Sequence, residues 1–532
     1  MSERRRMFYN DDGDSCLLSY RGAMRPEMVT DSVDVLLGTP VTTLVLCVSY
    51  SDLVTYPSDV ASMYGWRDTP SNRTSPFYRR VREFFRQVRE RDWDIPKMVL
   101  QRAHEEGLEF IPSMRMNDAH FAQKVPPQEH PLTGQFWMEH QDLIINPDTS
   151  WPAAYREFML DFRHAAVRQF RLDNAFEIID RYAANGFEMD WTRHPWYFRN
   201  GEAQPELITD MVRQVRARLD GRGPKGGVRL PLIVRVSASI EDCLRIGLDV
   251  PSWVKEGLVD YVVPSSPSRY ISFDMPISDW KALVAGAPVE VHASPDSAAP
   301  RGNGQATLEM YRAAASNYYA MGADGIYLFN LFCRGYPLAD DAYVIMRDLS
   351  CPEALQRRDK LFMATLDNWR SDTDTLSVPL TGPDRPARIG LMVGDDLAAA
   401  RAAGTLRRAV LRVRVDRFAP EDRLEIELNG TKLSMPGARA RAADGREIIE
   451  WSARTAAWTY ERQTLKGPWA WIEIGLEDVL PRQGDNLVTV RQLAQPAPDR
   501  QFELTLTDVD LAVSYSFCGS DPIMGAGSGA PG

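Results

Sequence analysis

Short apolar segments alternate with amphipathic segments from residue 7 to residue 347. The amphipathic ones, such as 26–37 and 207–219, have helical periodicity, and two helices are predicted at 154–169 and 174–184. The apolar ones have the length and composition of strands buried on both faces. Eight are predicted, at residues 7–10, 42–49, 109–114, 187–190, 232–236, 259–263, 289–292 and 326–330. This order predicts an α/β fold, the (β/α)8 or TIM barrel, rather than an open doubly wound sheet.

A different pattern, the alternation of apolar and polar residues, follows near the C-terminus. Segments 409–415, 423–428 and 486–491 alternate as strands with one buried face do, and Asn429-Gly430 has the sequence of a hairpin turn. We therefore predict an antiparallel β-sandwich after the barrel. The expected divisions are a barrel at 1–370, a linker at 371–386, the sandwich at 387–518 and a disordered tail at 519–532.

Composition and charge narrow the range of partners. The chain has 532 residues, of which 44% are hydrophobic and 25% charged, as in globular proteins. Its net charge of −11 argues against nucleic acid or an anionic membrane as the partner. The basic segment 1–7 is not followed by an apolar one, so we expect a cytoplasmic protein, or a periplasmic or secreted one if a signal has been removed. Homo-oligomerisation stays open.

Polar residues follow or end almost every predicted barrel strand. Because TIM barrels place their active sites at the carboxyl ends of their strands, this asymmetry predicts a polar active-site mouth. In strand order, the candidate residues are Asp11; Tyr50; Arg115, Asp118 and His120; Glu188, Asp190, Trp191, Arg193 and His194; Arg235; Asp274; Glu290 and His292; and Asn330.

The fourth strand carries the strongest single signal. Glu188 and Asp190 are two residues apart, so both side chains leave the same face of the strand. A carboxylate at a strand exit beside aromatic residues suits sugar cleavage, and the alternative is a structural ion pair with Arg193. We expect Asp190 to be catalytic and Glu188 to lie one layer lower, paired with Arg115 or Arg235.

Cleavage of a glycosidic bond usually requires a second carboxyl group, about 5 Å away for retention of configuration or about 6.5–9.5 Å away for inversion. Asp274, after the sixth strand, and Glu290, on the seventh, are the two main candidates, and Asp118 is the third. The remaining candidate residues are expected to bind substrate. Arginines among them would suit an acidic sugar.

No cofactor or metal is expected. The sequence has no Walker loop, no GxSxG elbow and no HExxH motif. Asp118 and His120, together with Asp11, Asp12 and His292, leave a metal-assisted reaction open, although their spacing is not diagnostic of a metal site.

Three segments resemble the family-10-like glycosyl hydrolases. Residues 160–168 (LDFRHAAVR), 178–182 (IIDRY) and 186–195 (GFEMDWTRHP) are similar to that family's D-F-x-x-x-x-V-R helix start and G-[IF]-E-x-D-[WF]-x-R strand. Arg115-Met-Asn-Asp118 and Phe273-Asp274-Met-Pro also fit the family. The resemblance covers about residues 7–350 and implies a barrel that hydrolyses carbohydrate, a role in polysaccharide degradation, and Asp190 as the catalytic acid.

The phrase Gly-Phe-x-x-Asp is also similar to the amylase-type barrels. This chain departs from them, since Glu188 stands where they have an arginine and the fifth strand ends in Ser-Ala-Ser without a glutamate. We therefore predict a glycoside hydrolase acting on an oligo- or polysaccharide, and the alternative is a non-catalytic carbohydrate-binding barrel.

Overall fold

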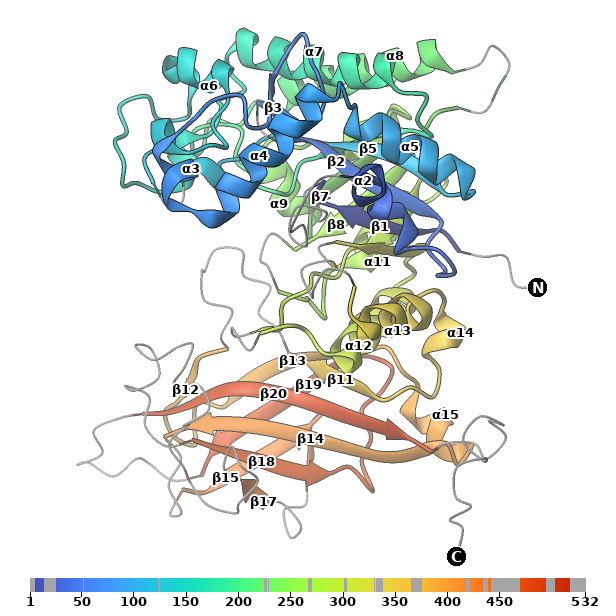
Figure 1. The fold of residues 1–532 in the computed structure, drawn as a ribbon. Helices are drawn as coiled ribbons and strands as arrows, with labels where there is room; N and C mark the ends of the chain where they lie inside the picture. The colour runs from blue at the N-terminus through green and yellow to red at the C-terminus, as the bar shows by residue number, and fades with distance from the viewer. Residues whose placement is uncertain are drawn as a thin grey trace, which may run out of the picture. The chain divides into compact units, whose positions relative to one another are not determined.

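The computed structural model consists of two compact units (Figure 1). The first comprises Met1–Arg269, Met275–Ser297 and Gly322–Ser350, and the second comprises Tyr270–Asp274, Ala298–Met321 and Cys351–Gly532. The structure describes residues 5–13, 25–50, 52–122, 125–223, 227, 229–266, 270–300, 304–329, 331, 338–364, 376–417, 422–433, 439–441, 469–493 and 503–516. Among these residues, no helix has both the length and the apolar character that a membrane span requires.

Eight parallel strands form a closed barrel in the first unit, which confirms the predicted TIM barrel. They are β1 (Met7–Asp11), β2 (Thr43–Tyr50), β5 (Glu109–Arg115), β6 (Phe187–Asp190), β7 (Leu232–Ser237), β8 (Tyr261–Ser265), β9 (Glu290–Ala293) and β10 (Gly325–Leu328). Each strand pairs with the next, and β1 pairs with both β2 and β10, so the sheet closes. Two further short strands, β3 (Leu53–Val54) and β4 (Ser62–Met63), extend the sheet beyond β2.

The barrel interior changes from apolar to polar along the strands. A buried cluster fills its middle and consists of Phe8, Val45, Ile111, Ile233, Val263, Tyr327 and Phe329. Alternate residues of a strand share a face, so Ser113, Arg235 and Ser265 follow Ile111, Ile233 and Val263 on the inner side. The interior is therefore polar towards the carboxyl ends of these strands, as the sequence predicted.

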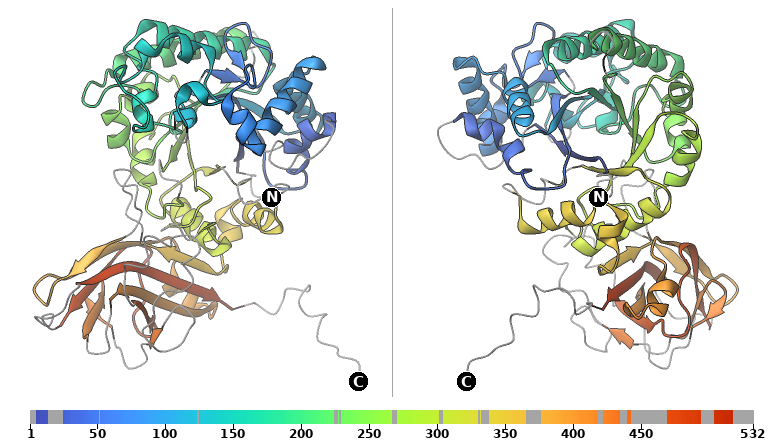
Figure 2. Two further views of the ribbon diagram at one scale, coloured as in Figure 1. Left: turned by 60° about the vertical axis from the view of Figure 1, so that its left-hand side comes forward. Right: turned by 90° about the vertical axis from the view of Figure 1, so that its right-hand side faces the viewer.

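Helices surround the strands of this unit (Figure 2). Several begin at positions that favour a helix start: Asp94 caps α5 by accepting a hydrogen bond from Lys97 N (3.1 Å), and Pro205 is the first residue of α8. The helices are α2 (Pro26–Asp34), α3 (Pro70–Thr74), α4 (Pro76–Glu90), α5 (Ile95–Glu105), α6 (Gln135–Glu139), α7 (Ala165–Arg181), α8 (Pro205–Arg222), α9 (Ile240–Arg245), α10 (Val250–Lys255), α11 (Ile277–Leu283) and α13 (Asp340–Asp348).

The segment between β5 and β6 differs from the prediction. A single helix, α7, replaces the two predicted helices, and the predicted first helix contains a 3-10 turn at Tyr155–Phe158 instead. The backbone N–H groups of Asp161 and Phe162 donate to the carbonyls of Leu143 (2.9 Å) and Tyr197 (2.8 Å). An N–H that pairs with a distant carbonyl cannot also join a helical ladder, so these tertiary hydrogen bonds delay the helix until Ala165.

The second unit contains two antiparallel sheets, which confirms the predicted β-sandwich. One sheet has the order β11 (Lys360–Met363), β20 (Leu504–Tyr515), β14 (Leu406–Asp416), β18 (Trp469–Gly475) and β17 (Arg439–Arg441), with β12 (Val378–Leu380) also on β20. The other has the order β13 (Ala387–Val393), β19 (Gly484–Gln492), β15 (Leu424–Leu428) and β16 (Thr431–Lys432). This unit also contains α12 (Leu308–Ala320), α14 (Pro352–Leu355) and α15 (Leu397–Ala402).

The expected hairpin joins β15 to β16. Asn429 and Gly430 both have positive φ, 53° and 79°, as the two central residues of a type I′ turn do. Leu428 pairs with Thr431 directly across the turn, so the loop has two residues.

The expected boundary between the units is corrected by the strand pairing. β11 and β12 lie within the segments assigned to the barrel and the linker, yet both pair with β20. The long strand β20 has room for both on one edge, because β11 pairs with residues 510–513 and β12 with residues 504–506. Residues 371–375 of the expected linker and the expected tail at 519–532 lie outside the described residues.

Candidate active site

The register of three neighbouring strands brings three charged residues into one row. Asp190, the last residue of β6, is opposite Arg115 on β5 and Arg235 on β7. Its Oδ1 accepts hydrogen bonds from Arg235 Nη1 (2.8 Å) and from the backbone N of Thr192 (2.9 Å). Asp190 is only 3% exposed. The carboxylate is therefore held in one orientation at a strand exit, as predicted, but its ion pair is with Arg235 and not with Arg193.

Arg235 is fixed by neighbours other than Asp190. Its Nε donates to Ser265 Oγ (3.1 Å), and its guanidinium group lies 3.6 Å from the centre of the Phe329 ring. Burial opposes the charge on Arg235, but the acids around it, Asp190 first, raise its pKa above the usual value. Arg235 is thus a buried, permanent cation in the upper part of the barrel.

Glu188 lies one layer below Asp190, as predicted, but its partners differ from the prediction. Its Oε1 accepts hydrogen bonds from Ser113 Oγ (2.6 Å) and Tyr327 OH (3.0 Å), while Oε2 is buried and has no hydrogen-bond partner among the described residues. We expected an ion pair with Arg115 or Arg235. Since the contacts are neutral hydroxyl groups, burial, reinforced by the nearby charge of Asp190, raises the pKa of Glu188 to about 7.

Arg115 binds two carboxylates next to the row of charged residues on β5, β6 and β7. Its Nη1 donates to Asp118 Oδ2 (3.0 Å), its Nη2 donates to Asp12 Oδ1, and its guanidinium group lies 5.1 Å from the centre of the Tyr50 ring. Although burial raises the pKa of Asp12, Arg115 and Arg193 together lower it below the usual value.

Asp12 replaces Asp11 at this position of the site. Asp11 Oδ1 accepts a hydrogen bond from Gly13 N (2.7 Å) and so stabilises the turn after β1, whereas the side chain of Asp12 contacts Arg115. From the sequence, Asp11 and not Asp12 was expected among the substrate-binding residues. Both acids follow the strand directly, and only the direction in which the chain leaves β1 decides which of them contacts Arg115.

A chain of hydrogen bonds links Asp118 to Arg193. Asp118 Oδ1 lies 2.6 Å from His120 Nδ1, and Arg193 Nη2 lies 3.1 Å from His120 Nε2. Since arginine only donates, His120 Nε2 is the acceptor and its Nδ1–H donates to Asp118. Burial and the charge of Arg193 lower the pKa of His120 to about 3, so His120 is neutral.

Asp118, His120 and His194 are the group of potential metal ligands found among the described residues. One ligand atom from each lies within 4.8 Å of the others. However, Arg193 donates to His120 Nε2, and Ala119 N donates to His194 Nδ1 (3.1 Å). These two lone pairs are therefore already used, and Arg193 adds a positive charge beside the cluster, so the arrangement fits a hydrogen-bond network better than a metal centre.

Two predicted residues, Glu290 and His292, lie away from this cluster. Glu290 begins β9, at the opposite end of the strands from Asp190, and its carboxylate contacts His292 Nε2 (2.9 Å). His292 is fully buried against the rings of Phe8 and Tyr261, so it belongs to the core and not to the mouth. Asp274 is exposed, accepts a hydrogen bond from Ser272 Oγ (3.2 Å) and belongs to the second unit. Asn330 lies outside the described residues.

Trp191 is a core residue and not a sugar-stacking surface. It has no exposed area, and its ring packs against those of Tyr197 (5.2 Å between centroids), Trp253 (6.0 Å) and Phe162 (6.2 Å). The residue after Asp190 leaves the opposite face of the strand, so it points away from the barrel interior.

Asp296 is the acid that sequence reasoning missed. It follows β9 by three residues and is 8% exposed. Burial raises its pKa to about 6, while the Ser297 N–H and the charges of Arg193 and Arg235 oppose the rise. Asp190 was predicted because it is an acid at a strand exit. The same criterion applies to Asp296, which lies in the sequence Ser294-Pro295-Asp296 just after β9. The sequence suggested Glu290 instead, which stands at the start of the same strand.

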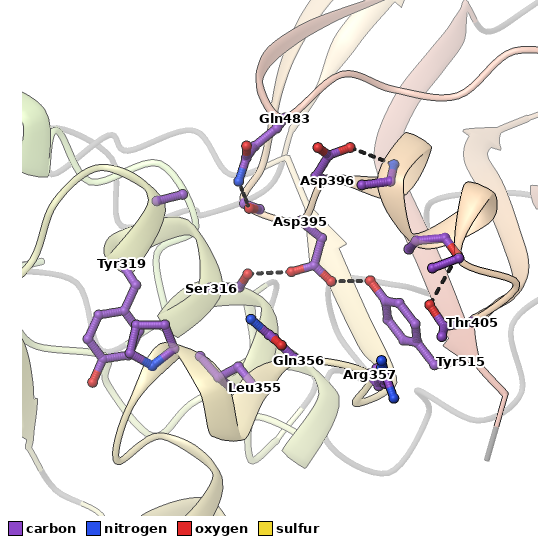
Figure 3. A pocket seen from close by; sticks show the side chains of 16 residues that line it. Ser316, Tyr319, Leu355, Gln356, Arg357, Asp395, Asp396, Thr405, Gln483 and Tyr515 are labelled. Atoms are coloured by element: carbon purple, nitrogen blue, oxygen red, sulfur yellow. Dashed lines mark hydrogen bonds between the residues drawn. The ribbon is translucent and has the colours of Figure 1, made fainter. Parts of the chain in front are cut away.

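A pocket of about 500 Å³ lies in the second unit (Figure 3). Asp395, in its wall, accepts hydrogen bonds from Ser316 Oγ and Tyr515 OH and forms an ion pair with Lys360 Nζ (2.9 Å). Asp396 caps α15 through the backbone N of Ala399 (2.9 Å). Because these carboxylates already have partners within the protein, their contacts indicate a structural role, and the candidate reaction centre is the one in the barrel.

Comparisons with known proteins do not assign this chain to a family. No protein-family model matches the sequence, and no curated protein matches it. Similar solved structures include a cycloisomaltooligosaccharide glucanotransferase from Paenibacillus sp. (TM-score 0.33, 10% identity, 95% of this chain, 57% of that chain). An α-L-fucosidase isoenzyme from Paenibacillus thiaminolyticus has TM-score 0.41 and 14% identity, over 66% of this chain and 49% of that one.

A third similar structure is the PgaB glycoside hydrolase domain from Bordetella bronchiseptica (TM-score 0.39, 12% identity, 65% of this chain, 99% of that chain). The chain spans about half the length of the glucanotransferase and of the fucosidase. At these TM-scores the likeness carries no argument about activity. Family-10-like membership therefore remains a prediction from the sequence, and the activity has to be argued from the site.

Proposed function

We propose that the barrel hydrolyses glycosidic bonds and that Asp190 and Asp296 are its two catalytic carboxyl groups. A single observation carries the proposal: two acids at the exits of β6 and β9 share the neighbourhood of Arg235 but differ in their surroundings. Asp190 contacts the arginine directly, whereas the pKa of Asp296 is raised to about 6 by burial. Glycosidases separate an acid from a nucleophile or base in this way, through different environments of two carboxyl groups.

The roles follow from these environments. Asp296 gives its proton to the glycosidic oxygen as the bond from that oxygen to the anomeric carbon breaks. Asp190 then either attacks the anomeric carbon, forming an ester that water hydrolyses, or removes a proton from the attacking water. The first route retains the anomeric configuration and the second inverts it, so the anomer of the first product distinguishes them.

The test is turnover of D190N and D296N. The substrates are oligosaccharides from polygalacturonate, alginate, carrageenan, cellulose and starch, and the products are followed by mass spectrometry. We expect each change to lower kcat/KM by about 100-fold or more, as loss of a general acid or base does. In the wild type, kcat/KM should fall as pH rises above about 6, because Asp296 then loses its proton.

The matched control is D279N, the same change at an exposed position of α11, which should leave turnover unaffected. D274N and E290Q in the same assay test the two carboxyl groups that the sequence suggested. Loss of turnover in either, with D296N still active, would transfer the acid role to that residue. Full turnover by D190N would end the proposal.

Burial of the site favours one alternative, a barrel that binds carbohydrate without cleaving it. Asp190, Glu188 and Arg235 are all buried, and the contacts described above satisfy several of their polar atoms. A binding protein would retain sugars from the same panel without releasing products, and D190N would then change affinity but no rate.

A further inference from the structure

Three arginines lie at or near the strand exits of the candidate site, and they differ in their counter-ions. Arg115 contacts the carboxylates of Asp12 and Asp118, and Arg235 contacts that of Asp190. Among the described residues, no carboxylate lies within 4.0 Å of the Arg193 guanidinium group. Of these three arginines, Arg193 is therefore the one whose charge has no carboxylate partner at close range within the described part of the chain.

Arg193 is nevertheless held in place. Its Nη2 donates to His120 Nε2 (3.1 Å), and its guanidinium carbon lies 5.7 Å from the centre of the Phe329 ring. His120 is neutral and is itself held by Asp118, so it orients Arg193 without neutralising it. Arg193 is thus a fixed cation and not a mobile surface side chain.

One donor of Arg193 has no acceptor in the part of the protein that the structure describes. Its Nε is buried, and none of the described residues accepts a hydrogen bond from it. Buried N–H groups are almost always paired, so an acceptor on a bound ligand would satisfy this donor. A guanidinium group matches the two oxygens of a carboxylate or sulfate better than it matches a sugar hydroxyl group.

The position of Arg193 relates this acceptor to the proposed reaction. Its charge lowers the pKa of Asp12 and opposes the rise in that of Asp296, so both acids lie within its electrostatic reach. Arg193 and Arg235 also share the Phe329 ring. An oxyanion bound by Arg193 would therefore lie beside the proposed catalytic carboxyl groups.

We propose that Arg193 binds an acidic group of the substrate, so that the barrel acts on a uronic or sulfated glycan. The proposal rests on the proposed function for the identity of the ligand as a glycan. It does not rest on cleavage, because recognition of the acidic group can be measured as binding.

The experiment measures binding by isothermal titration calorimetry with the full chain at low salt. The probes are oligosaccharides from polygalacturonate and alginate, which carry only carboxylates, from carrageenan, which carries only sulfates, and neutral ones from cellulose and starch. We expect at least one acidic class to bind about tenfold or more tightly than the neutral sugars. The class that binds distinguishes a uronate from a sulfate.

The variant R193Q should remove this preference, whereas R193K should keep part of it because a lysine retains the charge but not the planar fork. The matched control is R407Q, a change of an exposed arginine on β14, which should bind like the wild type. Thermal unfolding of R193Q without ligand, with a midpoint close to that of the wild type, shows that the variant is folded.

Several results would overturn the proposal. They are the absence of binding to every acidic probe, a preference for neutral sugars, and equal binding of acidic probes by the wild type and R193Q. Failure of the hydrolase proposal gives a different result, namely acidic binding that depends on Arg193 in a protein that releases no product.

Discussion

Two carboxyl groups two residues apart on β6, those of Glu188 and Asp190, have different environments. Asp190 contacts a permanent cation, whereas Glu188 contacts hydroxyl groups in the barrel interior. Because burial disfavours the charged form of an acid, Glu188 keeps its proton to about pH 7. Ionisation of Glu188 therefore lowers the free energy of unfolding, and this loss can be measured.

The variant E188Q should be more stable than the wild type at pH 8. The pKa of Glu188 is raised from about 4.3 in an unfolded chain to about 7 in the folded protein. The folded state thus holds the proton more tightly, and stability falls as pH rises from about 4 to about 7, by roughly 4 kcal/mol in total. Glutamine keeps the acceptor for Ser113 and Tyr327 and does not ionise, so this loss should be absent from E188Q.

Urea unfolding of both proteins at pH 5 and pH 8 measures the effect, and D279N serves as the control for removal of an exposed carboxyl group. If the wild type and E188Q lose the same stability between the two pH values, Glu188 is not the buried acid described here.

At the scale of elements, helix α12 is joined to the end of β13 by one buried side chain. Asn317 Nδ2 donates to the carbonyls of Phe273 (2.7 Å) and Met392 (3.2 Å), and its Oδ1 accepts from Gly394 N (2.6 Å). A Cβ at Gly394 would lie 2.4 Å from the backbone of Ser316, so the helix and the turn after β13 approach too closely for any larger residue.

The change N317A should therefore lower the free energy of unfolding by about 3 kcal/mol. It removes three hydrogen bonds of buried groups, at roughly 1 kcal/mol each. Denaturant unfolding measures the loss, and N200A, at an exposed turn, should change stability by less than about 0.5 kcal/mol. A loss equal to that of N200A would show that these contacts do not stabilise the helix.

At the scale of the whole molecule, the two units are interleaved along the chain. The second unit takes 270–274 and 298–321 from between barrel strands β8, β9 and β10, and it also takes β11. Neither unit is therefore one continuous stretch of sequence, and a single cut cannot separate them.

A fragment of residues 1–350 should fail to fold as an independent barrel. It contains α12 but lacks β13 and the turn after it, so Ser316 and Asn317 lose Asp395, Met392 and Gly394. We expect an aggregated fragment or one that melts without cooperativity, as followed by circular dichroism and size-exclusion chromatography. A soluble fragment that melts cooperatively at the temperature of the full chain would contradict this expectation.

Local patterns in the sequence were sufficient for the architecture. Apolar periodicity predicted the barrel, and Asn429-Gly430 predicted the hairpin, because strand burial and positive φ depend on neighbouring residues. The position of Asp190 at a strand exit was predictable for the same reason. The helix expected at 154–169 failed because distant carbonyls bind its N–H groups, which no local pattern records.

The chemistry of the site was decided by closure of the barrel. Glu188 contacts Ser113 and Tyr327, which are 75 and 139 residues away in sequence, and Arg235 reaches Asp190 from 45 residues away. Strand register selects these partners, and burial then sets the charge of each acid. A sequence shows which residues can ionise, but the dielectric and the counter-ion that determine whether they do so arise only when eight strands meet.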